Sequence, residues 1–172
     1  MTTVLVTGPI GGGKSTLCRY FADAGYPVYD CDSRCKALYD SVPGLKEKIE
    51  ASLGIPFAEL KRVFSEPGML KRLEELVFPL LIEDIECWKS GLDAPVAFIE
   101  SATALQKPEF KQLWDKVLMV TAPARKRHAR NSEAAAREKL QSFDISLIDY
   151  TITNDSSLES LYQKANIFLQ SL

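Results

Sequence analysis

The sequence is poor in the features that mark several classes of protein. It has a single histidine, and its four cysteines lack the density and spacing of a disulfide framework or a zinc site. Lysine plus arginine total 21 and aspartate plus glutamate total 23, so there is no basic excess to attract nucleic acid or anionic lipid. Apolar stretches fall far short of the ~20 residues that span a bilayer. We therefore expect no nucleic-acid partner, no membrane partner and no structural metal.

The beginning of the chain also lacks a basic segment. Met1-Thr2-Thr3 leads directly into an apolar run, so we expect no signal peptide and a cytoplasmic location. The length of 172 residues is typical of one domain with a sizeable core. Nothing in the sequence determines the oligomeric state.

Short apolar runs alternate along the chain with segments of helical periodicity. Strands are expected at residues 4–7, 26–30, 96–100, 117–121 and 150–153. Strands that are continuously apolar and separated by helices indicate a parallel sheet covered on both faces. The sequence thus predicts an α/β fold around a parallel five-stranded sheet.

Besides a helix expected at residues 14–24, three further helical segments accompany the predicted sheet. Residues 41–92 are strongly helical and are expected to form a substrate-side insertion, whose last helix Pro79 should kink. Residues 123–141, rich in Arg, Lys and Ala, are expected to form a short lid. The final helix is expected to begin with a capping box of Ser156 and Glu159.

A phosphate-binding loop follows the first apolar run. Residues 8–16, GPIGGGKST, match the pattern GxxxxGK[ST] of the P-loop without a gap. Glycines let successive backbone N–H groups surround phosphate oxygens where a Cβ would obstruct them, and the following helix directs its positive end at the same anion. Lys14 is expected to reach the β- and γ-phosphates of ATP, and the Ser15 hydroxyl to bind Mg²⁺. The predicted nucleotide-binding residues are Gly8, Gly11, Gly12, Gly13, Lys14, Ser15 and Thr16.

The motifs that are missing limit the classes of nucleotide-binding protein to which the chain could belong. The chain has neither the DxxG and NKxD motifs of GTPases nor the apolar strand ending in Asp-Glu of motor ATPases. A small-molecule kinase needs only a carboxylate near the attacking hydroxyl and cations for the migrating charge. Asp30 ends the second predicted strand, where parallel sheets bind ligands, and is a candidate catalytic carboxylate. Asp32 would face the same way in an extended segment, as a candidate Mg²⁺ contact through water, or it caps the next helix.

The densest basic cluster of the chain, residues 125–130, follows the fourth predicted strand. Such a run is usually a solvated helix face, but its place on the phosphate side of the sheet favours contact with a triphosphate. Arg127 and Arg130 are three residues apart, on one helical face, and are the candidate catalytic arginines.

The sequence resembles the dephospho-coenzyme A kinases nearly from end to end. The matching segments are the P-loop at 7–16, Asp30-Cys31-Asp32, Val63-Phe64, Leu73-Glu74, Glu100-Ser101-Ala102, the arginine helix and residues 150–155. The last segment is similar to the family's final strand and Asn-Asp-Gly turn, which implies that Asn154 lies beside the adenine of ATP. The resemblance implies one three-layer α/β/α P-loop kinase domain over 1–172. It also implies ATP- and Mg²⁺-dependent phosphorylation of the ribose 3′-hydroxyl of dephospho-coenzyme A, with Asp30 as the base.

Several places differ from the family pattern, among them the arginine helix and the segment after the third strand. Only six residues separate Arg130 from Arg137, which predicts the short lid, and Gln106 stands where the family tends to have Glu. Two alternatives therefore stay open: another small-molecule or nucleoside monophosphate kinase, and a nucleotide-binding sensor or scaffold with little turnover. The presence of Asp30, Lys14 and Ser15 favours a kinase, because a pure binder has little need of the carboxylate.

Overall fold

The computed structural model describes residues 1–131 and 143–172, which form two compact units. The first unit comprises Met1–Asp30 and Leu92–Leu172, and the second comprises Cys31–Gly91. The predicted helical insertion falls almost wholly in the second unit. Residues 132–141 of the predicted lid, which include Arg137, lie outside the described residues.

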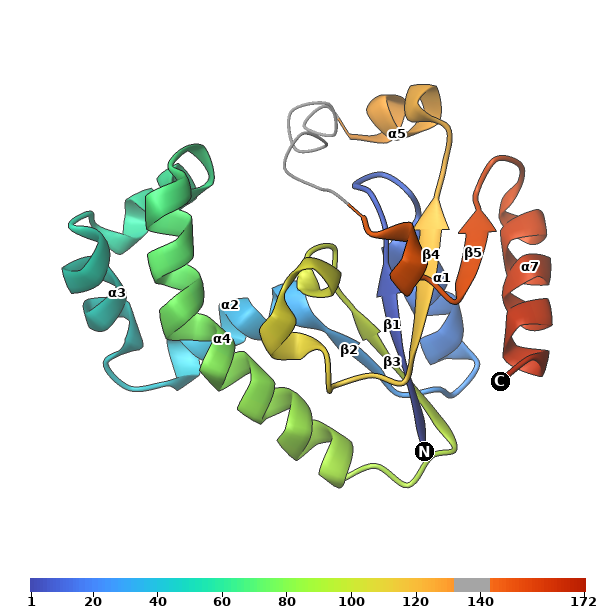
Figure 1. Cartoon of the computed structure of the whole chain (residues 1–172), viewed down its shortest axis with the longest axis horizontal. Coiled ribbons are helices and arrows are strands. Elements are labelled where there is room, and N and C mark those ends of the chain that lie inside the picture. The colour runs from blue at the N-terminus through green and yellow to red at the C-terminus, as the bar shows by residue number, and fades with distance from the viewer. Residues whose placement is uncertain (132–142) are drawn as a thin grey trace. The chain divides into compact units, whose positions relative to one another are not determined.

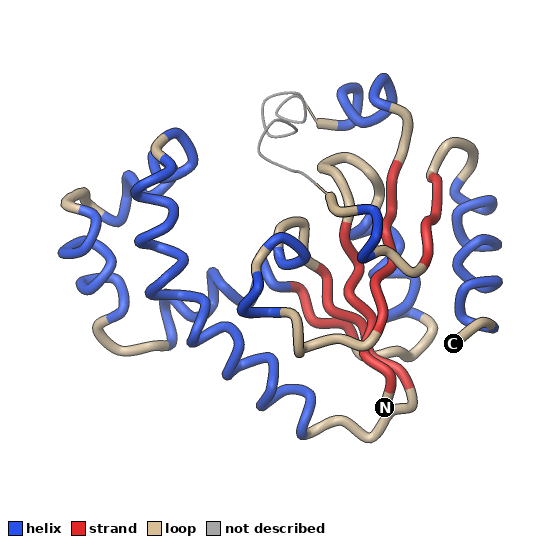
Figure 2. Tube along the Cα trace, viewed as in Figure 1, coloured by secondary structure: helices blue, strands red, loops and turns tan. Residues whose placement is uncertain are grey.

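A parallel sheet organises the first unit (Figure 2). Its order is β2-β3-β1-β4-β5. The strands are β1 (Thr2–Thr7), β2 (Val28–Asp30), β3 (Val96–Glu100), β4 (Lys116–Thr121) and β5 (Tyr150–Thr153). Every pairing is parallel, which confirms the predicted fold class and brings the ends of all five strands to one edge, here called the carboxyl edge. Only β2 is clearly shorter than expected, because it begins after Pro27, which has no N–H to donate to a ladder.

The strand register sets which side chains meet at the carboxyl edge. Asp30 and Glu100 are paired residues at the ends of β2 and β3, and Thr121 and Thr153 are paired at the ends of β4 and β5. In this order β1 is followed in sequence by β2, the strand at one edge of the sheet. Strand β4 is followed by β5, the strand at the opposite edge. The topological switch point therefore lies between β1 and β4, which is where open α/β sheets bind ligands.

Helices α1 and α7 share the apolar core with the sheet (Figure 1). Among the described residues of the first unit, the helices are α1 (Lys14–Asp23), α5 (Ala124–Arg130), α7 (Leu158–Gln170) and short 3-10 helices at Ala104–Gln106, Pro108–Phe110 and Ile145–Leu147. Phe21 of α1 stacks on Phe98 of β3, with ring centroids 4.1 Å apart, and both side chains are fully buried. Burial of each of these two phenylalanine side chains stabilises the folded state by about 1.5–3 kcal/mol.

Helix α7 begins one residue later than the sequence suggests. Its N-cap is Ser157, whose hydroxyl accepts a hydrogen bond of 3.2 Å from the Ser160 N–H. The predicted capping box of Ser156 and Glu159 is therefore wrong. The two adjacent serines are equivalent by residue type, and the end of β5 decides which one reaches the first turn of the helix.

The second unit is entirely helical. It consists of α2 (Cys31–Ser41), α3 (Leu45–Leu53), the 3-10 helix Phe57–Ser65 and α4 (Pro67–Ser90). Arg34 of α2 forms a two-point ion pair with Asp84 of α4, at 2.9 and 2.6 Å, and α4 continues through Pro79 without a break. Within the described part of the chain, no helix is both long enough and apolar enough to cross a membrane.

Candidate functional site

The loop between β1 and α1 has a backbone that only glycine adopts without strain. Gly8, Gly11 and Gly13 have φ values of +135°, +76° and +108°. A Cβ at Gly8 would lie 2.1 Å from the Val120 carbonyl oxygen, and one at Gly13 would lie 2.4 Å from the Asn154 side-chain nitrogen. The loop is thus pressed against the ends of β4 and β5, and side chains at these positions would displace it.

Lys14 turns its ammonium group back over the loop. The Nζ atom donates to the carbonyl oxygens of Gly8 at 2.9 Å and Pro9 at 3.2 Å, and the residue is buried. A buried ammonium needs such partners, because an unpaired charge away from water is costly. The cation is therefore held within the loop, at the N-terminus of α1.

Ser15 joins the loop to the end of β3. Its hydroxyl donates to the Glu100 carboxylate at 2.7 Å, and the buried Cys18 thiol lies near the same carboxylate. Burial raises the pKa of Glu100 above its ordinary value, and the nearby Asp30 charge also raises it, whereas the hydrogen bond from Ser15 lowers it. Glu100 was not among the residues predicted for the site. Its signal in the sequence was its place as the last residue of an apolar strand.

Of the two predicted aspartates, only Asp30 lies in the first unit. Asp30 ends β2 beside Glu100, at the carboxyl edge. Asp32 belongs to the first turn of α2 in the second unit. Because α2 begins at Cys31, the expectation that both carboxylates extend from one strand is wrong, and so is the alternative that Asp32 precedes and caps the helix. A contact of Asp32 with Mg²⁺ stays a prediction.

The two predicted arginines of α5 differ in their surroundings. Arg130 donates from Nη1 to the Gly11 carbonyl oxygen at 3.1 Å and is exposed. Arg127 is buried, and its Nε donates to the Ala122 carbonyl oxygen at 2.9 Å. A Cβ at Gly11 would lie 2.8 Å from the Arg127 carbonyl oxygen, so the backbone of α5 packs directly on the P-loop.

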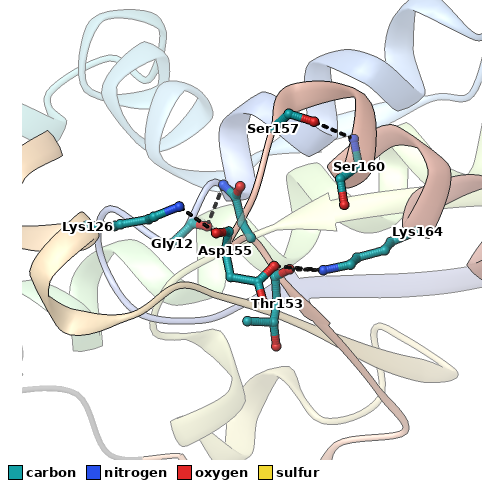
Figure 3. Close-up of polar contacts among 8 residues, drawn as sticks. Gly12, Lys126, Thr153, Asp155, Ser157, Ser160 and Lys164 are labelled. Atoms are coloured by element: carbon teal, nitrogen blue, oxygen red, sulfur yellow. Dashed lines mark hydrogen bonds and ion pairs between the residues drawn. The ribbon is translucent and has the colours of Figure 1, made fainter.

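Asn154 connects the end of β5 to the P-loop. Its side-chain nitrogen donates to the Gly12 carbonyl oxygen at 3.2 Å, and the residue is buried. Lys126, from the basic cluster at 125–130, and Lys164, which the sequence did not single out, donate to the residues on either side of Asn154 (Figure 3). The remaining predicted residue, Thr16, is exposed in α1, and its role stays a prediction.

The chemistry of these groups fits a magnesium–nucleotide complex. Ser15 gives its hydroxyl hydrogen to Glu100, which leaves oxygen lone pairs for a cation, and the adjoining carboxylates supply negative charge. Mg²⁺ prefers oxygen ligands and is usually held by one or two protein groups together with phosphates and water. The described residues contain no group of three or more His, Cys, Asp or Glu side chains that could hold a metal by themselves. The glycine backbone and Lys14 supply the corresponding donors for phosphate.

Comparison with known proteins gives consistent results. A family model described as dephospho-CoA kinase matches residues 2–170. The dephospho-CoA kinase of Porphyromonas gingivalis is 31% identical over 175 residues, covering 90% of this chain and 86% of that protein. A crystal structure from Thermus thermophilus is 29% identical, with a TM-score of 0.81 and coverage of 99% and 97% of the two chains. The dephospho-CoA kinase of Campylobacter jejuni, 20% identical over 98% and 95% of the chains, shares the fold with a TM-score of 0.63.

Proposed function

Because the chain belongs to the dephospho-CoA kinase family, we propose that it transfers the γ-phosphoryl group of ATP to the 3′-hydroxyl of dephospho-coenzyme A. This reaction is the last step of coenzyme A synthesis. The observation that carries the proposal is the arrangement at the carboxyl edge. A P-loop with a buried lysine lies beside two paired carboxylates, those of Asp30 and Glu100. Phosphoryl transfer needs a phosphate cradle and a carboxylate for the attacking hydroxyl.

In the proposed reaction the P-loop binds and orients the triphosphate. Backbone N–H groups of the loop and the N-terminus of α1 hold the phosphates, and Lys14 moves from the loop carbonyls to the β- and γ-phosphate oxygens. Ser15 would hold Mg²⁺, which when bound neutralises charge on the β- and γ-phosphates. Glu100 keeps the Ser15 hydroxyl in place through the hydrogen bond at 2.7 Å.

Asp30 is the proposed base. Its carboxylate at the end of β2 would accept the proton of the acceptor hydroxyl as the oxygen attacks the γ-phosphorus. Arg130, which already reaches the loop at Gly11, and Arg127 would offset the charge that develops on the transferred group. The Arg127 side chain is anchored on Ala122, so Arg130 is the freer of the two to follow the phosphate.

The other parts of the proposal concern the wider protein. The helical segment 41–92 would receive the pantetheine-bearing part of the acceptor, and residues 123–141 would act as the lid. Such an enzyme of small-molecule metabolism would work in the cytoplasm, with a small-molecule acceptor and no nucleic-acid or membrane partner.

An acceptor panel tests the proposal. Purified protein with Mg-ATP is offered dephospho-coenzyme A, then nucleoside monophosphates, then no acceptor, while ADP release is followed. Turnover with dephospho-coenzyme A, lost in Lys14→Ala, supports the proposal. Turnover only with a nucleoside monophosphate would show that the acceptor is a nucleoside monophosphate and not dephospho-coenzyme A. ATP binding without turnover on any acceptor would leave a nucleotide-binding sensor or scaffold.

A further inference from the structure

Asn154 is in direct contact with the backbone of the phosphate cradle. The residue directly follows β5, and its backbone N–H makes a bond of 2.7 Å to the Thr121 carbonyl oxygen, which continues the pairing with β4. Its side chain is buried, and the side-chain nitrogen donates to the Gly12 carbonyl oxygen at 3.2 Å. A Cβ at Gly13 would lie 2.4 Å from the same side-chain nitrogen of Asn154. Asn154 thus packs on the peptide that joins Gly12 to Gly13.

The orientation of that peptide decides where one N–H of the loop points. The peptide is planar and trans, so its C=O and N–H point in opposite directions. Because Asn154 holds the Gly12 C=O, the Gly13 N–H is directed away from Asn154. The Gly12 N–H has a different task, since it donates to the Pro9 carbonyl oxygen at 3.0 Å inside the loop. The Gly12–Gly13 peptide is therefore the one whose direction Asn154 sets.

Two lysines hold the residues on either side of Asn154 (Figure 3). Lys164 of α7 donates to the Thr153 carbonyl oxygen at 2.6 Å and to the Asp155 carboxylate at 2.9 Å. Lys126 of α5 donates to the Asp155 carbonyl oxygen at 2.5 Å. The backbone at Asn154 is thus fastened on both sides, from two different helices. Three hydrogen bonds from lysines to one turn exceed what capping of α7 requires, because Ser157 already supplies that cap.

We propose that Asn154 is a positioning residue for the phosphate cradle, which directs the Gly13 N–H toward a bound phosphate, and that Lys164 holds it there. The ligand that depends on Asn154 is then the polyphosphate, whichever base is attached to it. This inference rests on the proposed function only in assuming that the P-loop binds a nucleotide. It does not depend on the identity of the acceptor.

Binding measurements without any acceptor test the role of Asn154. The affinities of wild type and Asn154→Ala are measured by calorimetry for ADP, GDP and inorganic tripolyphosphate, with Mg²⁺ present. We expect all three affinities to fall by a similar factor, about 3–10-fold, which is the usual effect of one hydrogen bond. If tripolyphosphate affinity is unchanged, the proposal is overturned. In that case a loss of preference between ADP and GDP would indicate that Asn154 recognises the nucleotide base.

Lys164 provides a second route that keeps the Asn154 side chain intact. Lys164→Ala should lower the three affinities in the same proportion by about 2–5-fold, and Lys164→Arg, which keeps a donor to both oxygens, should restore most of the loss. Lys111→Ala is the matched control, since Lys111 is an exposed lysine of the same unit. Equal affinities in wild type and Lys164→Ala would overturn this part of the proposal. If wild type binds nucleotide but phosphorylates no acceptor, the proposed function fails while the proposal for Asn154 is still decided.

Discussion

Ser15 and Glu100 are joined by a hydrogen bond of 2.7 Å that connects the start of α1 to the end of β3. The hydroxyl hydrogen lies on the side of Glu100, so the oxygen of Ser15 keeps its lone pairs for a cation. The Glu100 carboxylate that orients Ser15 lies near the Cys18 thiol, and Glu100 is paired with Asp30 at the ends of β3 and β2. The Glu100 side chain thus links Ser15, the proposed metal ligand, to Asp30, the proposed base.

Replacement of Glu100 by Ala should therefore weaken the use of Mg²⁺. Without its acceptor the Ser15 hydroxyl loses its fixed orientation, and groups that orient a metal ligand are typically worth about 10–100-fold in metal affinity or activity. We expect a higher Mg²⁺ concentration for half-maximal turnover, measured by magnesium titration at saturating ATP. Glu109→Ala, at an exposed carboxylate of the same unit, should behave as wild type. An unchanged magnesium titration in Glu100→Ala would show that Glu100 does not act through Ser15.

Replacement of Asp30 by Asn should separate turnover from nucleotide binding. The amide keeps the size of the side chain but no longer accepts a proton, and a positioned base contributes about 10²-fold or more to the rate. The turnover number should fall by that factor while the affinity for ATP stays nearly constant, as measured by steady-state kinetics and calorimetry. Asp93→Asn, at an exposed aspartate before β3, is the control. Near-full turnover in Asp30→Asn would mean that another group takes the proton.

Replacement of glycines by Ala should distinguish backbone strain from direct collision. Gly8→Ala combines φ +135° with a Cβ 2.1 Å from the Val120 carbonyl oxygen, and it should both destabilise the fold and abolish nucleotide binding. Gly25→Ala has φ +90° but open space, so it should cost only about 1–2 kcal/mol of the free energy of unfolding. Gly68→Ala, in open space within α4, should be neutral or stabilising by up to about 1 kcal/mol. Chemical denaturation would measure the order, and a Gly8→Ala protein as stable as Gly25→Ala would contradict it.

The cysteines should differ in their reaction with a thiol reagent. Burial, followed by the neighbouring Glu100 charge, raises the pKa of the Cys18 thiol well above its ordinary value, and burial also raises the pKa of Cys35. A raised pKa lowers the fraction of reactive thiolate at any pH below it, so raising the pH from 7 to 8.5 should leave Cys18 unreactive. Cys87 is exposed and should be labelled first. Mass spectrometry of time points would establish the order. Labelling of Cys18 in folded protein at the rate of Cys87 would contradict the burial of that thiol.

The sheet and the phosphate loop could be predicted because they depend on local patterns. Continuous apolar runs indicated buried parallel strands, and the loop sequence required nearly all of its glycines for steric reasons. The start of α2 at Cys31, directly after β2, was missed because no local pattern separates the end of that strand from the start of the helix. For the same reason the spacing of Asp30 and Asp32 was misinterpreted as that of an extended segment.

The residues missed at the site share a single cause. Glu100, Lys126 and Lys164 contact groups that lie 85, 29 and 11 positions away in the chain. The end of an apolar strand and the basic cluster marked the places of Glu100 and Lys126, but the partners of all three residues could not be inferred from local spacing. Arg127 and Arg130 were predicted together from their spacing, yet one is buried against Ala122 and the other reaches Gly11. Helical spacing places two side chains on one face but does not say what that face meets.

By itself the sequence determined that a phosphate loop follows a buried strand, because the positive φ values that favour glycine and the charge of Lys14 belong to nine consecutive residues. Only the tertiary structure decided which donors orient that loop. Asn154 reaches Gly12 from 142 positions away in the chain, and Arg130 reaches Gly11 from 119 positions away. Hydrogen bonds form between groups that the strand order brings together, and that order results from the packing of the whole sheet.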